Sequence, residues 1–352
     1  MDLRRRLENT RWTEQPEALG WELGADAAYV RALCEHWRTE HDWRATEALI
    51  NEHENVRWEG LHCLRIPARE DGVPVVLLHG WPSGPLEYLQ SAELLAEAGY
   101  PALVPSLPGF GWSEDPGTPL NVAGVAARLH ALVSDGLGVE RYAVAGGDWG
   151  AIIAARMAFD QPDAVAGLYL STPGTLPVPG DLGDLGQAEQ DFVEIGTRWR
   201  RRQGHHLVIQ SLAPDVISPA LNDSPAGLAA YLLDKYRKWS DCDGDVEKRF
   251  SKDQLCDFVT MFWAEQTIAS SMRLYWGERS DRWRLGPGET IGVPAAVSLW
   301  AGQIPDPPRE WTERILTDLR RWTVMESGGH FAALEEPENY TSDLLAFLSG
   351  VS

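Results

Sequence analysis

A carboxylate stands at the centre of a short, glycine-rich stretch of the sequence. Asp148 is the third residue of Gly-Gly-Asp-Trp-Gly at 146–150, which follows the apolar run 142–145 and precedes a helix-like segment at 151–159. A strand, a sharp turn and a helix with one reactive side chain at the turn make a nucleophile elbow, where serine is usual. An aspartate there would form an ester, which favours a substrate with an electrophilic sp3 carbon. An Asp that only caps the helix is the alternative.

Two further loops supply groups that suit such a nucleophile. His330 lies in Ser-Gly-Gly-His-Phe at 327–331, directly after the last apolar segment. The sequence His-Gly-Trp-Pro at 79–82 follows an early apolar segment, where its backbone N–H groups could face a developing oxyanion. Nucleophile, acid and histidine in this chain order form the α/β-hydrolase triad, with the acid expected in the loop after Trp300. A lone histidine is more often an ordinary residue, but this position favours a catalytic one.

Short apolar segments alternate with helical patterns and would position these loops. Helical patterns occupy 122–137 and 308–319, and the strand-like segments are 73–78, 102–104, 142–145, 165–170, 294–300 and 322–325. Wholly apolar strands between helices indicate a parallel sheet covered on both faces. Functional groups gather beyond the carboxyl ends of strands in such a sheet. The sequence therefore predicts an α/β-hydrolase fold, with a mostly parallel, doubly wound sheet.

Three regions differ in composition. Residues 1–70 are polar, rich in tryptophan and predicted to form an N-terminal helical arm, whose segment 26–50 spaces its expected contacts helically: Tyr29, Leu33, Trp37, Trp43 and Leu49. The α/β core is predicted at 71–174 and 284–352. Between its two parts, 175–283 is helical, charged and aromatic, which favours a lid over the active site.

Composition excludes several classes of protein. The chain has 352 residues, enough for a large core, and a formal net charge of −21, which argues against nucleic acids and anionic membranes as partners. No apolar run is long enough to cross a bilayer, and the N-terminus lacks the pattern of a secretory signal. The four cysteines (Cys34, Cys63, Cys242, Cys256) have no metal-binding spacing and indicate reduced thiols in a cytoplasmic protein.

Taken together, these motifs resemble the microsomal-type epoxide hydrolases, which are α/β-hydrolases with an N-terminal helical arm. The resemblance covers nearly the whole chain, and its specific pieces are Asp42-Trp43-Arg44 with Glu47 and Asn51, His79-Gly80-Trp81-Pro82, the elbow at 146–150, Asn222-Asp223-Ser224-Pro225, and Gly328-Gly329-His330-Phe331 with Glu335-Glu336-Pro337. It implies a small-molecule epoxide as substrate and no metal or organic cofactor. Relatives with this arm often pair, so a homodimer is a further expectation.

The resemblance also implies roles for single residues. In that family two lid tyrosines hydrogen-bond the epoxide oxygen while an aspartate attacks a ring carbon, and a histidine oriented by an acid then activates water to hydrolyse the ester. Asp148 would be the nucleophile and His330 the general base, and the backbone amides of Trp81 and Trp149 would be the oxyanion donors. We expect Trp81, Trp149 and Phe331 to contact the substrate as well.

The lid departs from the family pattern at one of its two tyrosines. Tyr275 matches the second, whereas the first should lie about four residues before Gln210, where this sequence has His206. An imidazole N–H can donate to an epoxide oxygen, and a cationic imidazolium would be a stronger acid than phenol near neutral pH. A shifted register in a variable lid, or a merely exposed histidine, is the alternative.

A second departure concerns the triad acid, because Gln303 occupies the position where the family has Glu or Asp. Glutamine orients an imidazole but cannot stabilise imidazolium by charge, and losing that charge in a related triad costs about four orders of magnitude, much of it through a wrong tautomer. The loop 171–174 after the preceding strand holds no acid. Asp306 could substitute if the neighbouring prolines bend the loop, and Glu326 is a weaker candidate.

Four functions remain open at this stage. The first is an epoxide hydrolase acting on a bulky, largely apolar epoxide, in secondary metabolism. With Gln303 in place of an acid, the second is an enzyme that opens the epoxide of a biosynthetic intermediate without hydrolysis, cyclising it or forming a C–C bond. A haloalkane dehalogenase also uses an Asp followed by Trp, although the arm and Tyr275 count against it. A binding module without catalysis is the fourth.

Overall fold

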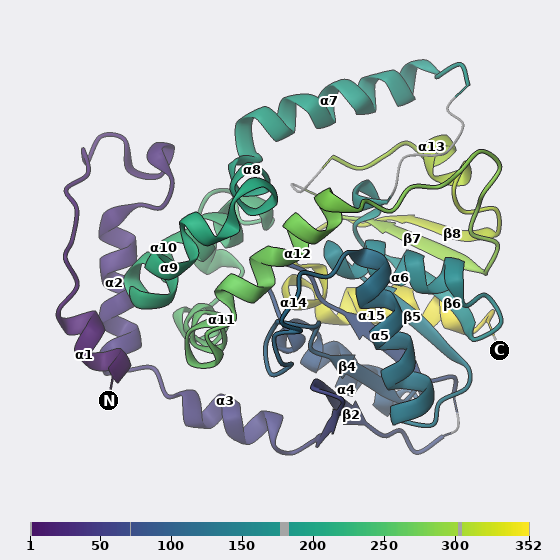
Figure 1. The fold of residues 1–352 in the computed structure, drawn as a ribbon, viewed down its shortest axis with the longest axis horizontal. Coiled ribbons are helices and arrows are strands. Elements are labelled where there is room, and N and C mark those ends of the chain that lie inside the picture. Colours follow the sequence, from purple (N-terminus) through teal and green to yellow (C-terminus); the bar gives the residue numbers. More distant parts are fainter. Residues whose placement is uncertain (1, 71, 177–182, 302–304, 352) are drawn as a thin grey trace.

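One eight-stranded sheet forms the centre of the molecule (Figure 1). The structure, a computed structural model, describes residues 2–70, 72–176, 183–301 and 305–351. In chain order the strands are β1 (Glu54–Trp58), β2 (Leu61–Ile66), β3 (Val75–Leu78), β4 (Ala102–Pro105), β5 (Tyr142–Gly146), β6 (Val165–Leu170), β7 (Ala295–Leu299) and β8 (Leu319–Val324). Their order across the sheet is β1-β2-β4-β3-β5-β6-β7-β8, and all pairs from β4 to β8 are parallel.

The inner parallel strands, β3 to β6, are apolar and wholly buried because both of their faces are covered. Along β3, Val75 and Leu77 face one hydrophobic core, whereas Val76 and Leu78 face the other. Helices α4 (Leu89–Glu97) and α15 (Pro337–Leu348) contribute to the first core, and α5 (Val122–Ala131) and α6 (Trp149–Asp160) to the second. This arrangement confirms the predicted α/β fold with a mostly parallel sheet.

Several predicted boundaries differ from the observed ones. The helix expected at 122–137 ends as α5 and continues as a π-helical turn over Leu132–Gly136. The helix expected at 308–319 is only α13 (Arg309–Glu313), and beyond it Leu316 forms an isolated parallel β-bridge with Ile291. Short helices at Pro85–Tyr88 and α14 (Ala332–Glu335) complete the core.

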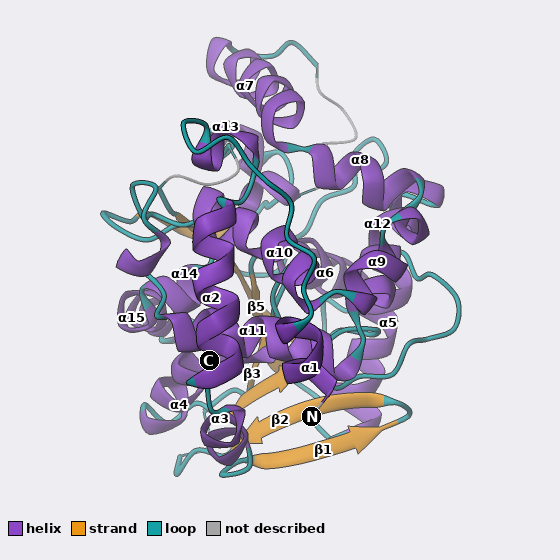
Figure 2. Ribbon diagram, turned by 90° about the vertical axis from the view of Figure 1, so that its left-hand side faces the viewer, coloured by secondary structure: helices purple, strands orange, loops and turns teal. Residues whose placement is uncertain are grey.

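The arm contains helices α1 (Asp2–Glu8), α2 (Ala27–Thr39) and α3 (Trp43–Ile50), with a 3-10 turn at Gly20–Leu23. The continuous helical pattern at 26–50 is interrupted because Asp42 caps a new helix, its carboxylate accepting from the N–H of Arg44 at 3.0 Å. Leu49, expected to make a contact, is 52% exposed, and α3 buries Ile50 instead. The arm region also contains β1 and β2, an antiparallel pair at the edge of the sheet that the helical pattern did not predict (Figure 2).

Six helices lie between β6 and β7 in the described part of this segment: α7 (Gln187–Gln203), α8 (His205–Leu212), α9 (Ser218–Asp223), α10 (Pro225–Trp239), α11 (Lys252–Glu265) and α12 (Ile268–Ser280). It also contains 3-10 turns at Pro173–Thr175, Pro214–Val216 and Val246–Lys248. The helices contact the loops that follow the strands. Tyr236 on α10 donates to the carbonyl of Pro82 at 3.0 Å, in the loop after β3. Ser270 on α12 donates to the carbonyl of Gly109 at 2.6 Å, beyond β4. The helical segment therefore covers the carboxyl ends of the parallel strands. No helix in the described residues is long and apolar enough to cross a membrane.

Candidate active site

Asp148 occupies the turn between β5 and α6 with a backbone that few side chains adopt, φ 50° and ψ −125°. Two glycines make this turn sterically possible. A Cβ on Gly150 would lie 1.8 Å from the carbonyl oxygen of Leu78, and one on Gly146 would lie 2.5 Å from the carbonyl carbon of Gly150. The sequence Gly-Gly-Asp-Trp-Gly is therefore what lets the turn pack directly against β3 and project a single carboxylate.

The two carboxylate oxygens of Asp148 have different neighbours. Oδ1 accepts from the backbone N–H of Trp81 at 2.9 Å, and the N–H of Trp149 also hydrogen-bonds to the carboxylate. Oδ2 lies 3.6 Å from Nε2 of His330. Burial raises the pKa of Asp148 to about 6, although the two N–H groups act in the opposite direction. One oxygen is thus held by amides, while the other faces an imidazole.

His330 is buried and is held from several sides. Its backbone N–H donates to the carbonyl of Trp239 at 2.8 Å, and the rings of Trp239 and Phe331 each lie 5.0 Å from the imidazole. The Glu335 carboxylate accepts the N–H of Phe331, which fixes the turn after the histidine. Burial lowers the pKa of His330 to about 3, so the imidazole is neutral and able to accept a proton at neutral pH.

Among the described residues, no triad acid hydrogen-bonds to the second nitrogen of this imidazole, Nδ1. Nδ1 of His330 has no hydrogen-bond partner among them, and neither has Oδ1 of Asp306. Burial raises the pKa of Asp306 to about 7. Glu326, the weaker candidate, is exposed, and Gln303 lies outside the described residues. Asp306 is therefore partly buried, with its Oδ1 shielded from solvent, but it is not hydrogen-bonded to His330 in this structure.

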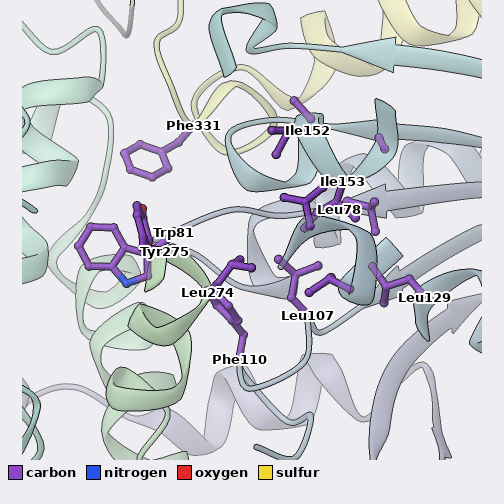
Figure 3. Close-up of a cluster of buried hydrophobic side chains, with 14 of the residues drawn as sticks. Leu78, Trp81, Leu107, Phe110, Leu129, Ile152, Ile153, Leu274, Tyr275 and Phe331 are labelled. Atoms are coloured by element: carbon purple, nitrogen blue, oxygen red, sulfur yellow. The ribbon is translucent and has the colours of Figure 1, made fainter. Parts of the chain in front are cut away.

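Tyr275 and His206 both line the cavity that contains Asp148. Tyr275 lies edge-on to the ring of Trp149, with the centroids 4.7 Å apart, and 6.0 Å from the ring of His206. Burial and the charge of Asp148 raise the pKa of Tyr275 well above its usual value, which keeps the phenol protonated. Figure 3 shows Tyr275 beside Trp81, and their centroids are 6.0 Å apart.

His206 is only 2% exposed and stacks on Trp81, with an interplanar angle of 7°. It is therefore not the merely exposed histidine of the alternative interpretation. Burial, with the nearby charges of Lys235 and His205, lowers the pKa of His206 to about 2. The expectation of a cationic imidazolium is thus wrong, because a desolvated imidazole beside a lysine stays neutral and can donate only its single N–H.

The cavity has a volume of about 850 Å³, and apolar side chains from α7, α8 and the core form much of its wall, including Ile152, Leu176, Phe192, Trp199, Leu207 and Trp311. Trp149, predicted to contact the substrate, also lines this cavity. The rings of Trp81 and Phe331 are not among the described lining residues. Trp81 instead supplies its backbone N–H and supports His206, and Phe331 stacks on Tyr236 at 4.5 Å.

One buried acid near the nucleophile was not anticipated from the sequence. Glu87 lies in a 3-10 turn of ordinary composition, so no motif singles it out. Burial raises the pKa of its carboxyl to about 8, and the charges of Asp148 and Glu335 act in the same direction. Glu87 is therefore neutral at pH 7, and the nucleophile has no second negative charge from this group beside it.

Comparisons with known proteins agree with this geometry. A family model described as "Epoxide hydrolase N terminus" matches residues 1–88, and one described as "alpha/beta hydrolase fold" matches 73–216. The chain is 33% identical to a "Putative epoxide hydrolase" of Stigmatella aurantiaca, over 97% of this chain and 80% of that one. It is 30% identical to "Epoxide hydrolase 1" of Sus scrofa, over 99% and 85% of the two chains.

Solved structures show the same similarity in three dimensions. Juvenile hormone epoxide hydrolase from the silkworm Bombyx mori superposes with a TM-score of 0.88 at 26% identity, covering 99% of this chain and 91% of that one. The Aspergillus niger epoxide hydrolase gives a TM-score of 0.86 at 25% identity, covering 100% and 93%. These similarities extend over the arm, the sheet and the helices that cover it.

Proposed function

The chain belongs to the epoxide hydrolase family and is a hydrolase of epoxide ether bonds with the α/β-hydrolase fold, and we propose that it opens a bulky, largely apolar epoxide through an ester on Asp148. One observation carries this proposal. Oδ1 of Asp148 is held by the N–H of Trp81, while Oδ2 lies 3.6 Å from Nε2 of His330. A carboxylate so placed has one oxygen in an oxyanion hole, while the other faces the imidazole that would later activate water.

In the first step, Oδ2 of Asp148 attacks a ring carbon and the carbon–oxygen bond of the epoxide breaks. The ring oxygen takes the phenol proton of Tyr275, whose raised pKa keeps that proton in place until it is needed. The neutral N–H of His206 hydrogen-bonds to the same oxygen, in the role that a second tyrosine would have. The product of this step is a hydroxyalkyl ester on Asp148.

In the second step, water attacks the carbonyl carbon of that ester and gives a proton to Nε2 of His330. The N–H groups of Trp81 and Trp149 hold the negative charge on the former Oδ1. Collapse releases the diol, whose oxygen takes the proton from His330. The carboxyl proton that remains on Asp148 returns to the oxygen of Tyr275, which restores the enzyme.

Asp306 is the proposed acid for this second step. Nδ1 of His330 and Oδ1 of Asp306 are both buried without a partner among the described residues. The Nδ1–H group is a donor and the carboxylate oxygen is an acceptor, so the two could satisfy each other. An Asp306→Asn variant should slow ester hydrolysis while leaving ester formation unchanged. If Gln303→Ala slows it instead and Asp306→Asn does not, glutamine is the orienting residue.

The unpartnered Nδ1 of His330 also favours a second candidate function. If no acid reaches His330, water activation is weak and another nucleophile, including one within the substrate, could open the epoxide without hydrolysis. Product analysis separates the two functions, because a diol as the sole product removes the second. Family membership favours both over haloalkane dehalogenation and over binding without catalysis.

Trapping the ester tests the proposed function. With His330→Gln, ester formation should proceed and hydrolysis should stall, so the intact mass of the protein should rise by the mass of the epoxide used, such as styrene oxide. Asp148→Asn is the matched control and should show no adduct. An adduct on Asp148→Asn, or diol formation by that variant at the wild-type rate, would overturn the covalent scheme.

We further propose a cytoplasmic enzyme of secondary metabolism, with an arm at 1–70, a core at 71–174 and 284–352, and a lid at 175–283. The four cysteines are buried and free, as suits a reducing compartment. A homodimer joined through the arm and the lid is part of the same proposal. Light scattering of the purified protein tests it, and a mass equal to one chain would contradict the dimer.

A further inference from the structure

Four arginines line the same cavity as the nucleophile: Arg200, Arg279, Arg282 and Arg284. The chain as a whole is strongly acidic, with 31 Lys and Arg against 52 Asp and Glu. General solubility therefore does not account for four positive charges around one opening, since the protein's excess charge has the other sign. A need for positive charge at this cavity is the simpler physical explanation for the four arginines.

Helix geometry places these charges in line with the reacting groups. Arg279 follows Tyr275 by four residues on α12, so it lies one turn further along the same face, about 5–6 Å away at Cβ. On α7, Arg200 continues the face formed by Phe192, Gly196 and Trp199, all of which line the cavity. A ligand that reaches Tyr275 with one end thus passes apolar side chains and meets guanidinium groups at the other.

None of these arginines is held in an ion pair with another described residue. Within the described part of the chain, no salt bridge joins any of the four to a carboxylate, whereas Arg273 on the outer side of α12 pairs with Asp115 at 3.0 Å and Asp215 at 3.2 Å. Besides Asp148, the acidic residue among the described lining residues is Glu278, whose carboxylate accepts the N–H groups of Val122 and Trp283 at 3.0 and 2.9 Å. The charge of Arg282 acts on Glu278 without a salt bridge between them. The guanidinium groups are therefore available to a ligand.

We infer that the epoxide bound by this enzyme carries a carboxylate at the end remote from the ring, held by the arginines of α7, α12 and the segment after α12. This inference rests on the proposed function of the same site. Guanidinium groups match the planar geometry of a carboxylate and can bind it through two parallel hydrogen bonds. The apolar wall between them and Asp148 fits a hydrocarbon body, so the substrate is an amphipathic epoxy acid.

A pair of probes that differ only in charge tests this inference: 4-(oxiran-2-yl)benzoate and its methyl ester. The wild-type enzyme should have the higher kcat/KM for the carboxylate, and the Arg200→Gln/Arg279→Gln double variant should lose at least about tenfold for the carboxylate while changing little for the ester. Arg201→Gln is the matched control, because Arg201 is exposed on α7 next to Arg200 but outside the cavity wall. It should leave both values unchanged.

Ionic strength gives a second readout. Raising it from about 0.01 M to about 1 M shortens the Debye length from about 30 to about 3 Å, which should remove most of the preference for the carboxylate. Equal kcat/KM values for the two probes in the wild type, or a preference that survives in the double variant, would overturn the inference while leaving epoxide hydrolysis intact.

Binding measurements separate a failure of this inference from a failure of the proposed function. Asp148→Asn binds either probe without turning it over, and its affinity is measurable by titration calorimetry. If neither probe is hydrolysed by the wild type, tighter binding of the carboxylate that is lost on removing Arg200 and Arg279 would still support the anion site. Equal affinities for the two probes would contradict it.

Discussion

Asp148 must keep a negative charge in a buried pocket, and the structure shows what opposes and what supports that charge. Burial raises its pKa to about 6, while the N–H groups of Trp81 and Trp149 lower it. For His330 burial acts in the opposite direction, because it lowers the pKa to about 3 and leaves the imidazole neutral at pH 7. The pair therefore exists near pH 7 as carboxylate and neutral imidazole, which are the forms that attack and accept a proton.

The pH dependence of kcat/KM should report this pair. Because Asp148 must be deprotonated to attack, activity should fall about tenfold per unit below pH 6 and be flat between about pH 7 and 8. His330 adds no limb in this range, since its pKa is about 3. An Asp306→Asn variant should keep the limb near pH 6, whereas a limb that disappears in that variant would assign it to Asp306 instead.

The raised pKa of Asp148 also makes the stability of the fold depend on pH. The folded-state pKa of Asp148 lies above its unfolded value of 3.8, so its contribution is fully present below pH 3.8 and is lost as pH rises through 6. Asp148→Asn removes this loss. We expect the variant to melt at a higher temperature than the wild type at pH 8, and the difference to shrink toward pH 4. A lower Tm at pH 8 would contradict the assigned burial cost.

Tyr275 supplies the proton to the opening ring in this account. Tyr275→Phe should lower the rate of ester formation by about 10²-fold, the lower end of general acid catalysis, with little change in ester hydrolysis. Stopped-flow tryptophan fluorescence measures both steps, since the ring of Trp149 lies 4.7 Å from Tyr275. Tyr231→Phe is a matched control, because Tyr231 packs against Trp81 at 5.7 Å but is not a lining residue.

At the scale of elements, the elbow is the most constrained part of the fold. Gly150→Ala would place a Cβ 1.8 Å from the carbonyl oxygen of Leu78, a backbone atom that cannot move without disturbing β3. We expect a loss of about 3 kcal/mol or more in the free energy of unfolding in urea. Gly196→Ala on α7 meets no atom within 4 Å and should be neutral or stabilising by up to about 1 kcal/mol.

Sequence patterns predicted the inner parallel strands β3 to β6 well because burial on both faces leaves no charged residue in them. The start of β8 was predicted three residues late, at 322, because this partly exposed strand carries Arg320 and Arg321. The segment 165–170 matches β6 at both ends, and 102–104 falls short of β4 by one residue. The edge pair β1 and β2 was missed because β1 is largely exposed and carries polar residues. An edge strand is defined by its partner, which a local pattern does not reveal.

At the site, too, local sequence patterns do not reveal which side chains meet or how their surroundings change them. Motif spacing indicated Asp148 and His330 as candidates, and the fold places Oδ2 of the one 3.6 Å from Nε2 of the other although 182 positions separate them in the sequence. The charge on His206 depends on burial and on Lys235, neither of which the local sequence contains. The sequence contains Arg200, Arg279, Arg282 and Arg284 without any pattern that links them, and only the fold shows that they border one cavity.

At the scale of the whole molecule, the arm is tied to the helices that cover the site. Trp37 on α2 is 3% exposed and donates from Nε1 to Oγ1 of Thr260 on α11 at 2.8 Å. Trp37→Ala should therefore lower the free energy of unfolding by about 3–5 kcal/mol through the cavity it leaves. Leu23→Ala, in the same arm but 62% exposed, should change it by less than about 0.5 kcal/mol. Equal effects of the two variants would mean that the arm does not dock in this way.

The proposed mechanism depends on the ester at Asp148, and a single turnover in 18O-labelled water tests that ester most directly. With enzyme in excess over an epoxide such as styrene oxide, the oxygen added to the diol should come from the unlabelled carboxylate. The peptide that contains Asp148 should then carry the heavy isotope. Labelled diol in the first turnover, with no label in that peptide, would mean that water attacks the ring directly and would contradict the mechanism.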